Sequence, residues 1–203
     1  MKKFIELQAE QRIAEGQQKW VFAYPNRSDL LIKVTNPSYR QSLAAKLLGW
    51  GRYGYFLPML RQLGEQIANQ LSPQPASYLE HVYGLVDTNF GLALVVEAIR
   101  DDQGQLAMNL RDLIDAGKYE SELAQHLEDF LQWLAKAPVI VYDLNLGNLV
   151  YAQGRLVMID GIGEPSRIGW RMLSAAFNGW KNRRKIKRFR YRVQRQLANP
   201  GFR

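Results

Sequence analysis

The chain has 203 residues, 47% of them hydrophobic, and a formal net charge of +8 at pH 7. A chain of this length forms one domain of ordinary size, or one domain built from two small lobes. It contains no cysteine and two histidines, which excludes disulfides, thiolate zinc sites, cysteine nucleophiles and multi-histidine metal sites. No apolar run approaches the ~18 residues that a membrane span requires. We therefore expect a protein of the reducing cytoplasm.

The positive charge is concentrated near the C-terminal end of the sequence. Residues 167–203 contain 12 basic and no acidic residues, whereas residues 1–166 contain 15 basic and 19 acidic residues, a net charge of −4. A uniformly basic nucleic-acid-binding domain is therefore not expected. The basic segment needs an explanation of its own.

In chain order, the first hundred residues are predicted to form short strands around one helical stretch. Aromatic and β-branched residues separated by Gly, Pro and Asn turns are typical of antiparallel strands. The predicted strands are 12–16, 19–24, 30–34, 81–85 and 92–99. Between the third and fourth strands, apolar residues of 38–72 recur at helical spacing, and a proline-rich sequence then ends the pattern.

The second hundred residues are predicted to be mainly helical. Residues 106–116 and 119–136 have helical apolar spacing, and Pro138 follows the second helix. Two short apolar segments, 139–149 and 155–161, flank a Gln-Gly turn and indicate a small hairpin. The order of elements therefore predicts an α+β fold.

The basic segment contains two apolar stripes at helical spacing, which predict final helices packed on the body. The stripes are Trp170, Leu173, Phe177, Trp180 and Ile186, Phe189, Val193, Leu197. Packing does not explain the Lys and Arg residues around the second stripe. We expect residues 170–195 to meet an anionic membrane surface or a phosphorylated glycolipid. Nucleic acid is the less favoured partner because the body is acidic.

Three polar residues stand at fixed intervals among apolar neighbours near the predicted hairpin. Asp143 and Asn148 are five residues apart in a loop that follows a helix, and Asp160 ends an apolar strand. A carboxylate that ends a buried strand is costly unless it binds a partner, usually a cation. A carboxylate together with an amide oxygen makes a site suited to Mg²⁺ carrying phosphates.

This arrangement resembles two protein-kinase motifs, Asp-x-x-x-x-Asn of the catalytic loop and the later Asp-Phe-Gly. The resemblance implies that Asp143 accepts the proton of the attacking hydroxyl and that Asn148 and Asp160 hold Mg²⁺. The sequence departs from the kinase pattern in three places. Val141-Tyr142 replaces His-Arg, Asn145 replaces Lys, and the second motif is Asp160-Gly161-Ile162-Gly163.

The predicted N-terminal strands fit the same resemblance. Lys33, alone in an apolar strand, corresponds to the lysine that binds the α- and β-phosphates, and Gly16 stands in the loop that covers them. Val21 is expected over the adenine, and the backbone of residues 97–99 is expected to face it. The cofactor-binding residues predicted in this way are Gly16, Val21, Lys33, Glu65, Glu97 and Ile99. The helical partner of Lys33 is expected to be Glu65, with Gln62 as the alternative.

Six segments in order resemble the PhoP-regulatory-network (YrbL-type) family of small bacterial proteins with a protein-kinase-like fold. They are residues 15–25, 32–34, 87–91, 96–101, 143–148 and 160–161. The resemblance implies a minimal two-lobed kinase-like fold. Its parts are an N-lobe of residues 1–97, a reduced C-lobe of residues 98–166, and a basic helical segment of residues 167–203 packed on that C-lobe.

The resemblance also implies ATP and Mg²⁺ as cofactors and phosphoryl transfer to a hydroxyl, with Asp143 and Lys33 as the catalytic residues. By analogy with lipopolysaccharide-core sugar kinases, the expected acceptor is an anionic cell-envelope glycan or lipid-linked molecule. Only 43 residues follow Asp160, too few for the peptide-binding segments of a protein kinase. This acceptor would place the protein in the cytoplasm or on the inner membrane surface.

The alternative is a pseudokinase or regulatory nucleotide-binding module. The single glycine at position 16 and the missing His-Arg before Asp143 favour it. Each motif residue also has a plain structural role available to it. In these roles, Asp143 and Asn148 would be ordinary turn or cap residues. Lys33 would be a strand lysine that extends its ammonium group to solvent, and Glu65 would be a solvated charge on a helix. The order in which they occur together favours the kinase-like interpretation.

Overall fold

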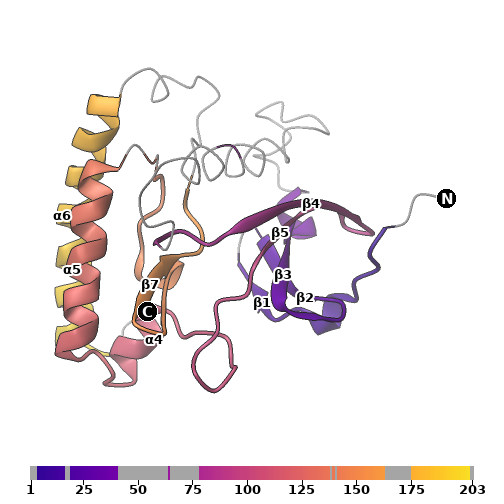
Figure 1. Ribbon diagram of the computed structural model, residues 1–203, viewed down its shortest axis with the longest axis horizontal. Coiled ribbons are helices and arrows are strands. Elements are labelled where there is room, and N and C mark those ends of the chain that lie inside the picture. The colour runs from indigo at the N-terminus through magenta and orange to yellow at the C-terminus, as the bar shows by residue number, and fades with distance from the viewer. Residues whose placement is uncertain are drawn as a thin grey trace. The chain divides into compact units, whose positions relative to one another are not determined.

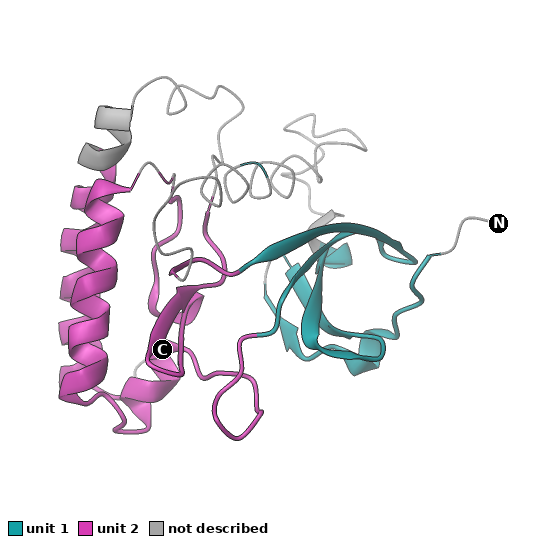
Figure 2. Cartoon of the chain, viewed as in Figure 1, with its two compact units in different colours: residues 1–66, 81–98 teal, residues 67–80, 99–203 magenta. Residues whose placement is uncertain are grey.

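The structure is a computed structural model that describes residues 4–16, 19–40, 64, 78–137, 139, 141–162 and 175–201. It is a mixed α+β protein in which every strand pair of the two sheets is antiparallel. The chain forms two compact units (Figure 2). Unit 1 comprises residues 1–66 and 81–98, and unit 2 comprises residues 67–80 and 99–203.

Unit 1 contains a five-stranded sheet with the strand order β1-β2-β3-β5-β4 (Figure 1). Its strands are β1 (Ala14–Glu15), β2 (Lys19–Tyr24), β3 (Arg27–Thr35), β4 (Val82–Thr88) and β5 (Gly91–Glu97). A short 3-10 helix, η1 (Ala9–Gln11), precedes the sheet, and α1 (Pro37–Arg40) follows β3. The five strands lie where the sequence predicted strands.

The β2–β3 hairpin is tighter than the sequence predicted. β3 begins at Arg27 because Asn26 adopts a positive φ of 59°, which allows a two-residue turn after Tyr24. Arg27 then binds Asp29 through two side-chain hydrogen bonds of 2.8 and 2.6 Å. These bonds lower the pKa of the Asp29 carboxyl to about 2. Arg27, Ser28 and Asp29 therefore belong to the start of β3 and not to a longer turn.

The two faces of the sheet carry different side chains, because successive residues of a strand point to opposite faces. One face is packed with Leu7, Phe22, Ile32, Val34 and Ala93. Trp20, Phe22 and Phe90 form ring contacts with centroids 5.5 to 6.4 Å apart there. The other face carries the smaller cluster of Val82, Leu94 and Val96. Lys33 lies on this second face, since its cross-strand partners are Val21 and Leu94.

Unit 2 contains helices and a β-hairpin. The elements are α4 (Leu110–Asp115), α5 (Ser121–Lys136), the 3-10 helix η3 (Leu146–Asn148), β6 (Leu149–Ala152), β7 (Arg155–Met158) and α6 (Ala175–Ala198). The helix predicted at 106–116 begins only at Leu110. Asn109 caps it by accepting a hydrogen bond from the Asp112 N–H, and the Ala107 N–H is bonded instead to the Ile99 carbonyl.

One hydrophobic core holds unit 2 together. Buried side chains of α4, α5, η3 and the hairpin contribute to it, with Phe130, Leu149 and Val141 fully buried. Ile186, Phe189 and Val193 of α6 belong to the same core. The basic helix therefore packs on this unit through three residues of its second apolar stripe, whereas the fourth, Leu197, is 40% exposed. The first stripe, from Trp170 to Trp180, lies outside the residues whose side chains are described.

Among the residues that the structure describes, no helix combines the length and the apolar composition needed to cross a membrane.

Candidate functional site

The loop before β6 holds Asp143, Asn145 and Asn148 in one hydrogen-bonded network. Asn145 caps η3 by accepting a hydrogen bond from the Asn148 N–H at 3.0 Å, and its Nδ2 donates to Asp143 Oδ2 at 2.7 Å. Asn148 Nδ2 donates to the Asp143 carbonyl at 3.0 Å and to Asp143 Oδ2 at 3.3 Å. Two amides therefore orient one carboxylate.

The segment around Asp160 is bonded to both ends of that loop. The Ile159 N–H donates to the Asn148 carbonyl at 2.9 Å. The Gly161 carbonyl accepts hydrogen bonds from the N–H groups of Tyr142 and Asp143 at 2.8 and 3.2 Å. Unit 2 thus brings together the three residues that the sequence singled out. Asp160 is half-buried, and Asp143 is exposed.

Gly161 makes this close approach possible. Its φ is +84°, and a Cβ atom at this position would lie 2.2 Å from the Asp143 carbonyl oxygen. Real Cβ atoms do not approach backbone oxygens so closely, so only glycine fits. The Gly161 N–H also donates to Asp160 Oδ1 at 2.8 Å, which orients that carboxylate. The sequence shows the Asp-Gly pair but not the backbone that lies against it.

The bonds already made determine which oxygens remain for a ligand. Asn148 uses its Nδ2 on Asp143, and its Oδ1 has no hydrogen-bond partner among the described residues. The described residues contain no group of three or more His, Asp or Glu side chains that could hold a metal ion. Magnesium does not require one, because it binds through one or two protein oxygens plus phosphates and water. Asn148 and Asp160 therefore offer the donor types that fit Mg²⁺.

Lys33 is the candidate phosphate ligand in unit 1. Its side chain is 5% exposed on β3, between apolar neighbours in sequence. Val21 pairs with Lys33 across β2 and β3, so the two side chains project from the same face of the sheet. The structure thus places these two predicted nucleotide-contacting residues beside each other.

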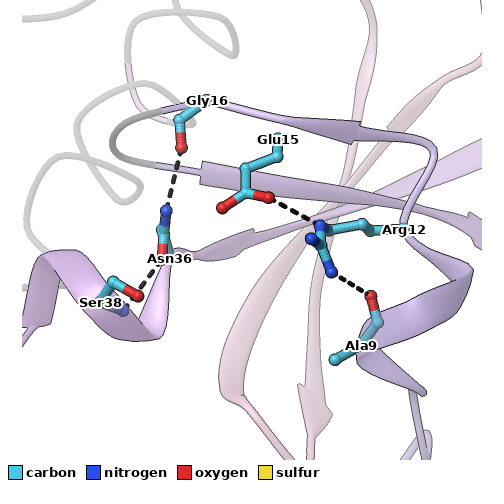
Figure 3. A network of polar contacts seen from close by, with 6 residues as sticks. All are labelled: Ala9, Arg12, Glu15, Gly16, Asn36 and Ser38. Atoms are coloured by element: carbon cyan, nitrogen blue, oxygen red, sulfur yellow. Dashed lines mark hydrogen bonds and ion pairs between the residues drawn. The ribbon is translucent and has the colours of Figure 1, made fainter.

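The loop at Gly16 is anchored by hydrogen bonds to the rest of unit 1 (Figure 3). The Gly16 N–H donates to the Lys19 carbonyl at 2.8 Å, and buried Asn36 donates from Nδ2 to the Gly16 carbonyl at 3.0 Å. Asn36 Oδ1 accepts from the Ser38 N–H at 2.9 Å. A Cβ atom on Gly16 would lie 3.5 Å from the nearest backbone oxygen, which is an ordinary contact. The fold itself does not require glycine here.

The neighbouring strand β1 is also fixed locally. Arg12 binds Glu15 at 2.8 Å and donates to the Ala9 carbonyl at 2.7 Å (Figure 3). Its guanidinium lies 5.1 Å from the centroid of the Trp20 ring. The strands that lead into and out of the Gly16 loop are therefore held by contacts outside the loop.

The backbone that was predicted to face adenine is only partly available. The Glu97 N–H donates to the His81 carbonyl at 2.9 Å, and the Ala98 N–H donates to the Asp29 carbonyl at 2.8 Å. The Glu97 carboxylate accepts from the His81 N–H at 3.3 Å. The Ile99 carbonyl accepts from Ala107, whereas the Ile99 N–H has no partner among the described residues. Of the two predicted residues Glu97 and Ile99, Ile99 is therefore the one whose backbone N–H could donate a hydrogen bond to a ligand.

The remaining predicted residues lie elsewhere. Glu65 and its alternative Gln62 fall outside the described residues. Lys33 and Glu97 belong to unit 1, and Ile99, Asp143, Asn148 and Asp160 belong to unit 2. Sequence reasoning missed the orienting roles of Asn145 and Gly161. The Asp-x-Asn spacing was a usable signal for Asn145, because an Asn two residues after an Asp commonly bonds back to it.

A family model described as PhoP regulatory network protein YrbL matches residues 5–194 of the chain. The match includes all the candidate residues and most of α6. No curated protein matches the chain.

Proposed function

The chain belongs to the family of PhoP regulatory network protein YrbL, and we propose that it is a phosphotransferase with a minimal protein-kinase-like fold. The proposed reaction uses ATP and Mg²⁺ and transfers the γ-phosphoryl group to a hydroxyl. The observation that carries the proposal is the network of Asp143, Asn145 and Asn148 bonded to the Asp160-Gly161 turn. Catalysis of this kind depends mainly on positioning and charge neutralisation.

The proposed role of Asp143 is to orient and deprotonate the acceptor. Its Oδ2 accepts two amide hydrogen bonds, while its Oδ1 has no partner among the described residues. As the acceptor gives its proton to this carboxylate, its oxygen forms a bond to the γ-phosphorus. The bond from that phosphorus to the β,γ-bridging oxygen breaks, and ADP leaves with the electron pair.

Asn148 and Asp160 are proposed to hold the metal ion, and Lys33 the phosphates. Magnesium bound to these oxygens would neutralise charge that develops on the β- and γ-phosphates. Lys33 is 5% exposed in an apolar strand, the position in which the resemblance to kinases expects the phosphate-binding lysine. Its cross-strand neighbour Val21 supplies an apolar surface on the same face for the base.

For the acceptor we propose an anionic cell-envelope glycan or lipid-linked hydroxyl. The exposed basic residues of α6 support an anionic acceptor, because the helix contains no acidic residue that would offset their positive charge.

A second candidate is a regulatory nucleotide-binding module without turnover. Val141 and Tyr142 stand where kinases have His-Arg, and the Val141 side chain is fully buried in the core of unit 2. The chain therefore lacks the polar pair that precedes the catalytic Asp in active kinases. Nucleotide binding without phosphoryl transfer would fit this difference.

The test combines thermal unfolding with measurement of ADP release. We expect Mg·ATP at a hundredfold excess over its Kd to raise Tm by about 5 °C or more, since this ligation stabilises by about 2.7 kcal/mol. Asp143→Ala should retain that stabilisation and lose ~10² to 10⁴-fold in turnover. Asp102→Ala, which removes an exposed loop carboxylate, is the matched control and should change neither.

The outcomes separate the two candidates. Stabilisation by Mg·ATP without any ADP release would support the binding module. Absence of stabilisation would contradict both. Turnover that survives in Asp143→Ala would show that another group accepts the proton.

A further inference from the structure

The outward face of α6 is basic along most of its length. Seven Lys and Arg side chains of this helix are exposed, and the helix contains no Asp or Glu. They are Arg183, Arg184, Lys187, Arg188, Arg190, Arg192 and Arg195. Arg190 is paired with Glu128 of α5, and Arg184 and Arg195 also have interaction partners. This set, with Tyr191, is called the basic face below.

The helix is fixed to unit 2 by its opposite face. Ile186, Phe189 and Val193 are buried in the core. Near the C-terminal end of the helix, Gln196 donates to Asp115 of α4 at 2.7 Å. With Ile186, Phe189 and Val193 buried, the large apolar side chains that remain exposed among residues 181–198 are Tyr191 and Leu197. Attachment through the outward face of this part of α6 is therefore expected to be mainly electrostatic.

An aromatic residue lies in the middle of the basic face. Tyr191 is 67% exposed, the highest value among the exposed large hydrophobic residues of the described chain. Lys187, Arg188 and Arg195 lie three or four residues away and are therefore its neighbours on the helix surface. Tyrosine is enriched at the membrane–water interface, where its ring and hydroxyl face different environments. Basic residues around an exposed tyrosine match an anionic interface.

The way α6 packs disfavours a nucleic-acid duplex. A helix with its side chains is about 10–12 Å across, and the major groove is about 12 Å wide. The helix runs alongside α5 (Figure 1), with Arg190 bonded to Glu128 and Asn182 bonded to the Leu134 carbonyl. The helix pair is wider than the groove, and α5 contributes acidic residues beside it. A flat anionic surface can contact the basic face without having to accommodate the width of the helix pair.

We propose that the basic face of α6 docks the protein on a membrane surface rich in anionic phospholipid headgroups. Each Lys or Arg near such a surface contributes about a fivefold gain in partitioning. The contacts are electrostatic, so binding falls as the ionic strength rises.

The test is cosedimentation of the full chain with vesicles. We expect binding to vesicles of equal parts phosphatidylcholine and phosphatidylglycerol, and none to phosphatidylcholine alone. Lys187→Gln with Arg188→Gln should lower the partition coefficient about 25-fold. Lys118→Gln with Lys136→Gln removes the same charge from exposed positions outside α6 and should have a several-fold smaller effect.

Equal losses in the two double variants would overturn the proposal, because net charge alone would then explain binding. Failure of the wild-type chain to bind the anionic vesicles would overturn it as well. Binding of single-stranded RNA in place of the vesicles would show that the basic face serves nucleic acid. Circular dichroism of each variant checks that it is folded.

A different observation concerns the inner side of the same helix. Lys185 Nζ donates to the Val141 carbonyl at 2.6 Å and to the Tyr142 carbonyl at 2.7 Å. One turn earlier, fully buried Asn182 donates from Nδ2 to the Val139 carbonyl at 2.9 Å. The residue that follows Tyr142 is Asp143. An ammonium group from α6 is thus bonded to the backbone that leads directly into the candidate catalytic carboxylate.

The geometry assigns Lys185 as a positioning residue for Asp143, an inference that rests on the proposed function. The N–H groups of Tyr142 and Asp143 are held by the Gly161 carbonyl. Lys185 holds the carbonyl of Tyr142 and that of the preceding residue. Hydrogen bonds that involve a charged group are about twice as strong as neutral ones. Lys185 thereby restricts the peptide plane that precedes Asp143.

Lys185→Met keeps the aliphatic stem and removes the donors, and Lys136→Met, at an exposed position of α5, is the matched control. We expect amide hydrogen exchange in residues 141–148 to rise about tenfold in Lys185→Met only, with Lys185→Arg restoring protection. The kcat should fall by a similar factor while KM for ATP changes little. If Lys185→Met does not fold, Lys185→Gln supports the same measurement.

The hydrogen-exchange result decides the role of Lys185 whether or not the chain turns over ATP. Unchanged exchange in residues 141–148 of Lys185→Met would overturn the assignment. Increased exchange in Lys185→Met, together with no ADP release by the wild-type chain, would instead contradict the proposed function alone. A rise in KM without a fall in kcat would contradict positioning of Asp143 and favour a nucleotide contact.

Discussion

Gly16 in unit 1 and Gly161 in unit 2 both occur in predicted ligand-binding motifs, but the fold treats them differently. At Gly161 a Cβ atom would lie 2.2 Å from the Asp143 carbonyl oxygen, and φ is +84°. At Gly16 the nearest atom would be 3.5 Å away. The first glycine is required by the folded chain itself. A requirement for the second would have to come from a bound ligand.

The same contrast extends to the side chains around the two glycines. In unit 2, Asp143, Asn145 and Asn148 bind one another and are oriented before any ligand arrives. In unit 1, Val21 and Lys33 share a sheet face, and the Gly16 loop is anchored through its backbone by Asn36. Unit 2 therefore holds the candidate polar residues in a fixed arrangement, whereas the candidate residues of unit 1 share a sheet face and are not bonded to one another in this way.

The largest effect is expected from Gly161→Ala. The added methyl group would displace the Asp143 backbone, costing about 2–3 kcal/mol of stability and at least ~10²-fold in turnover. Urea unfolding and ADP release measure the two effects. Gly104→Ala is the matched control because Gly104 also has a positive φ, of +75°, but no atom within 4 Å. Equal costs for the two variants would show that the close approach to Asp143 is unimportant.

Asn145→Ala should have the next largest effect. It removes the cap of η3 and the 2.7 Å bond to Asp143, at a cost of about 1–2 kcal/mol. We expect turnover to fall about tenfold as Asp143 loses its orientation. Asn109→Ala removes the equivalent cap of α4 and should cost similar stability with unchanged turnover. A fall in turnover in both variants would indicate a general loss of stability and not a local one.

Gly16→Ala should have the smallest effect and should affect only binding. The fold accommodates the methyl group, so the free energy of unfolding should stay within about 0.5 kcal/mol of wild type. Affinity for Mg·ATP, measured by calorimetry, should fall about three- to tenfold if the loop backbone approaches the phosphates. Unchanged affinity would remove Gly16 from the proposed site. A large loss of stability would remove the contrast with Gly161.

The sequence predicted the sheet of unit 1 well because its strands have strong local signals. β-branched and aromatic residues alternate, and Gly, Pro or Asn mark each turn. The helix predicted from residue 106 begins later because the chain first pairs with a distant segment. Ala107 bonds to Ile99, and Asn109 pairs with Val150 in a bridge. Apolar spacing cannot reveal such long-range pairing.

For the candidate site, spacing alone identified Asp143, Asn148 and Asp160. These residues are close in sequence and flank one hairpin, so their proximity follows from a short turn. Lys185 is more than forty residues from the carbonyls it binds. Nothing in its own neighbourhood distinguishes it from the basic residues around it.

The sequence by itself determined the positions of the strands in unit 1, the polar triplet at the hairpin and the basic character of α6. Each is a local pattern in which side-chain chemistry and spacing carry the information. Only the tertiary structure decided that Gly161 must lie against Asp143, that Ile186, Phe189 and Val193 of α6 are buried, and that Lys185 faces inward. These facts depend on contacts between distant segments, where a few ångströms of backbone separation select which side chain fits.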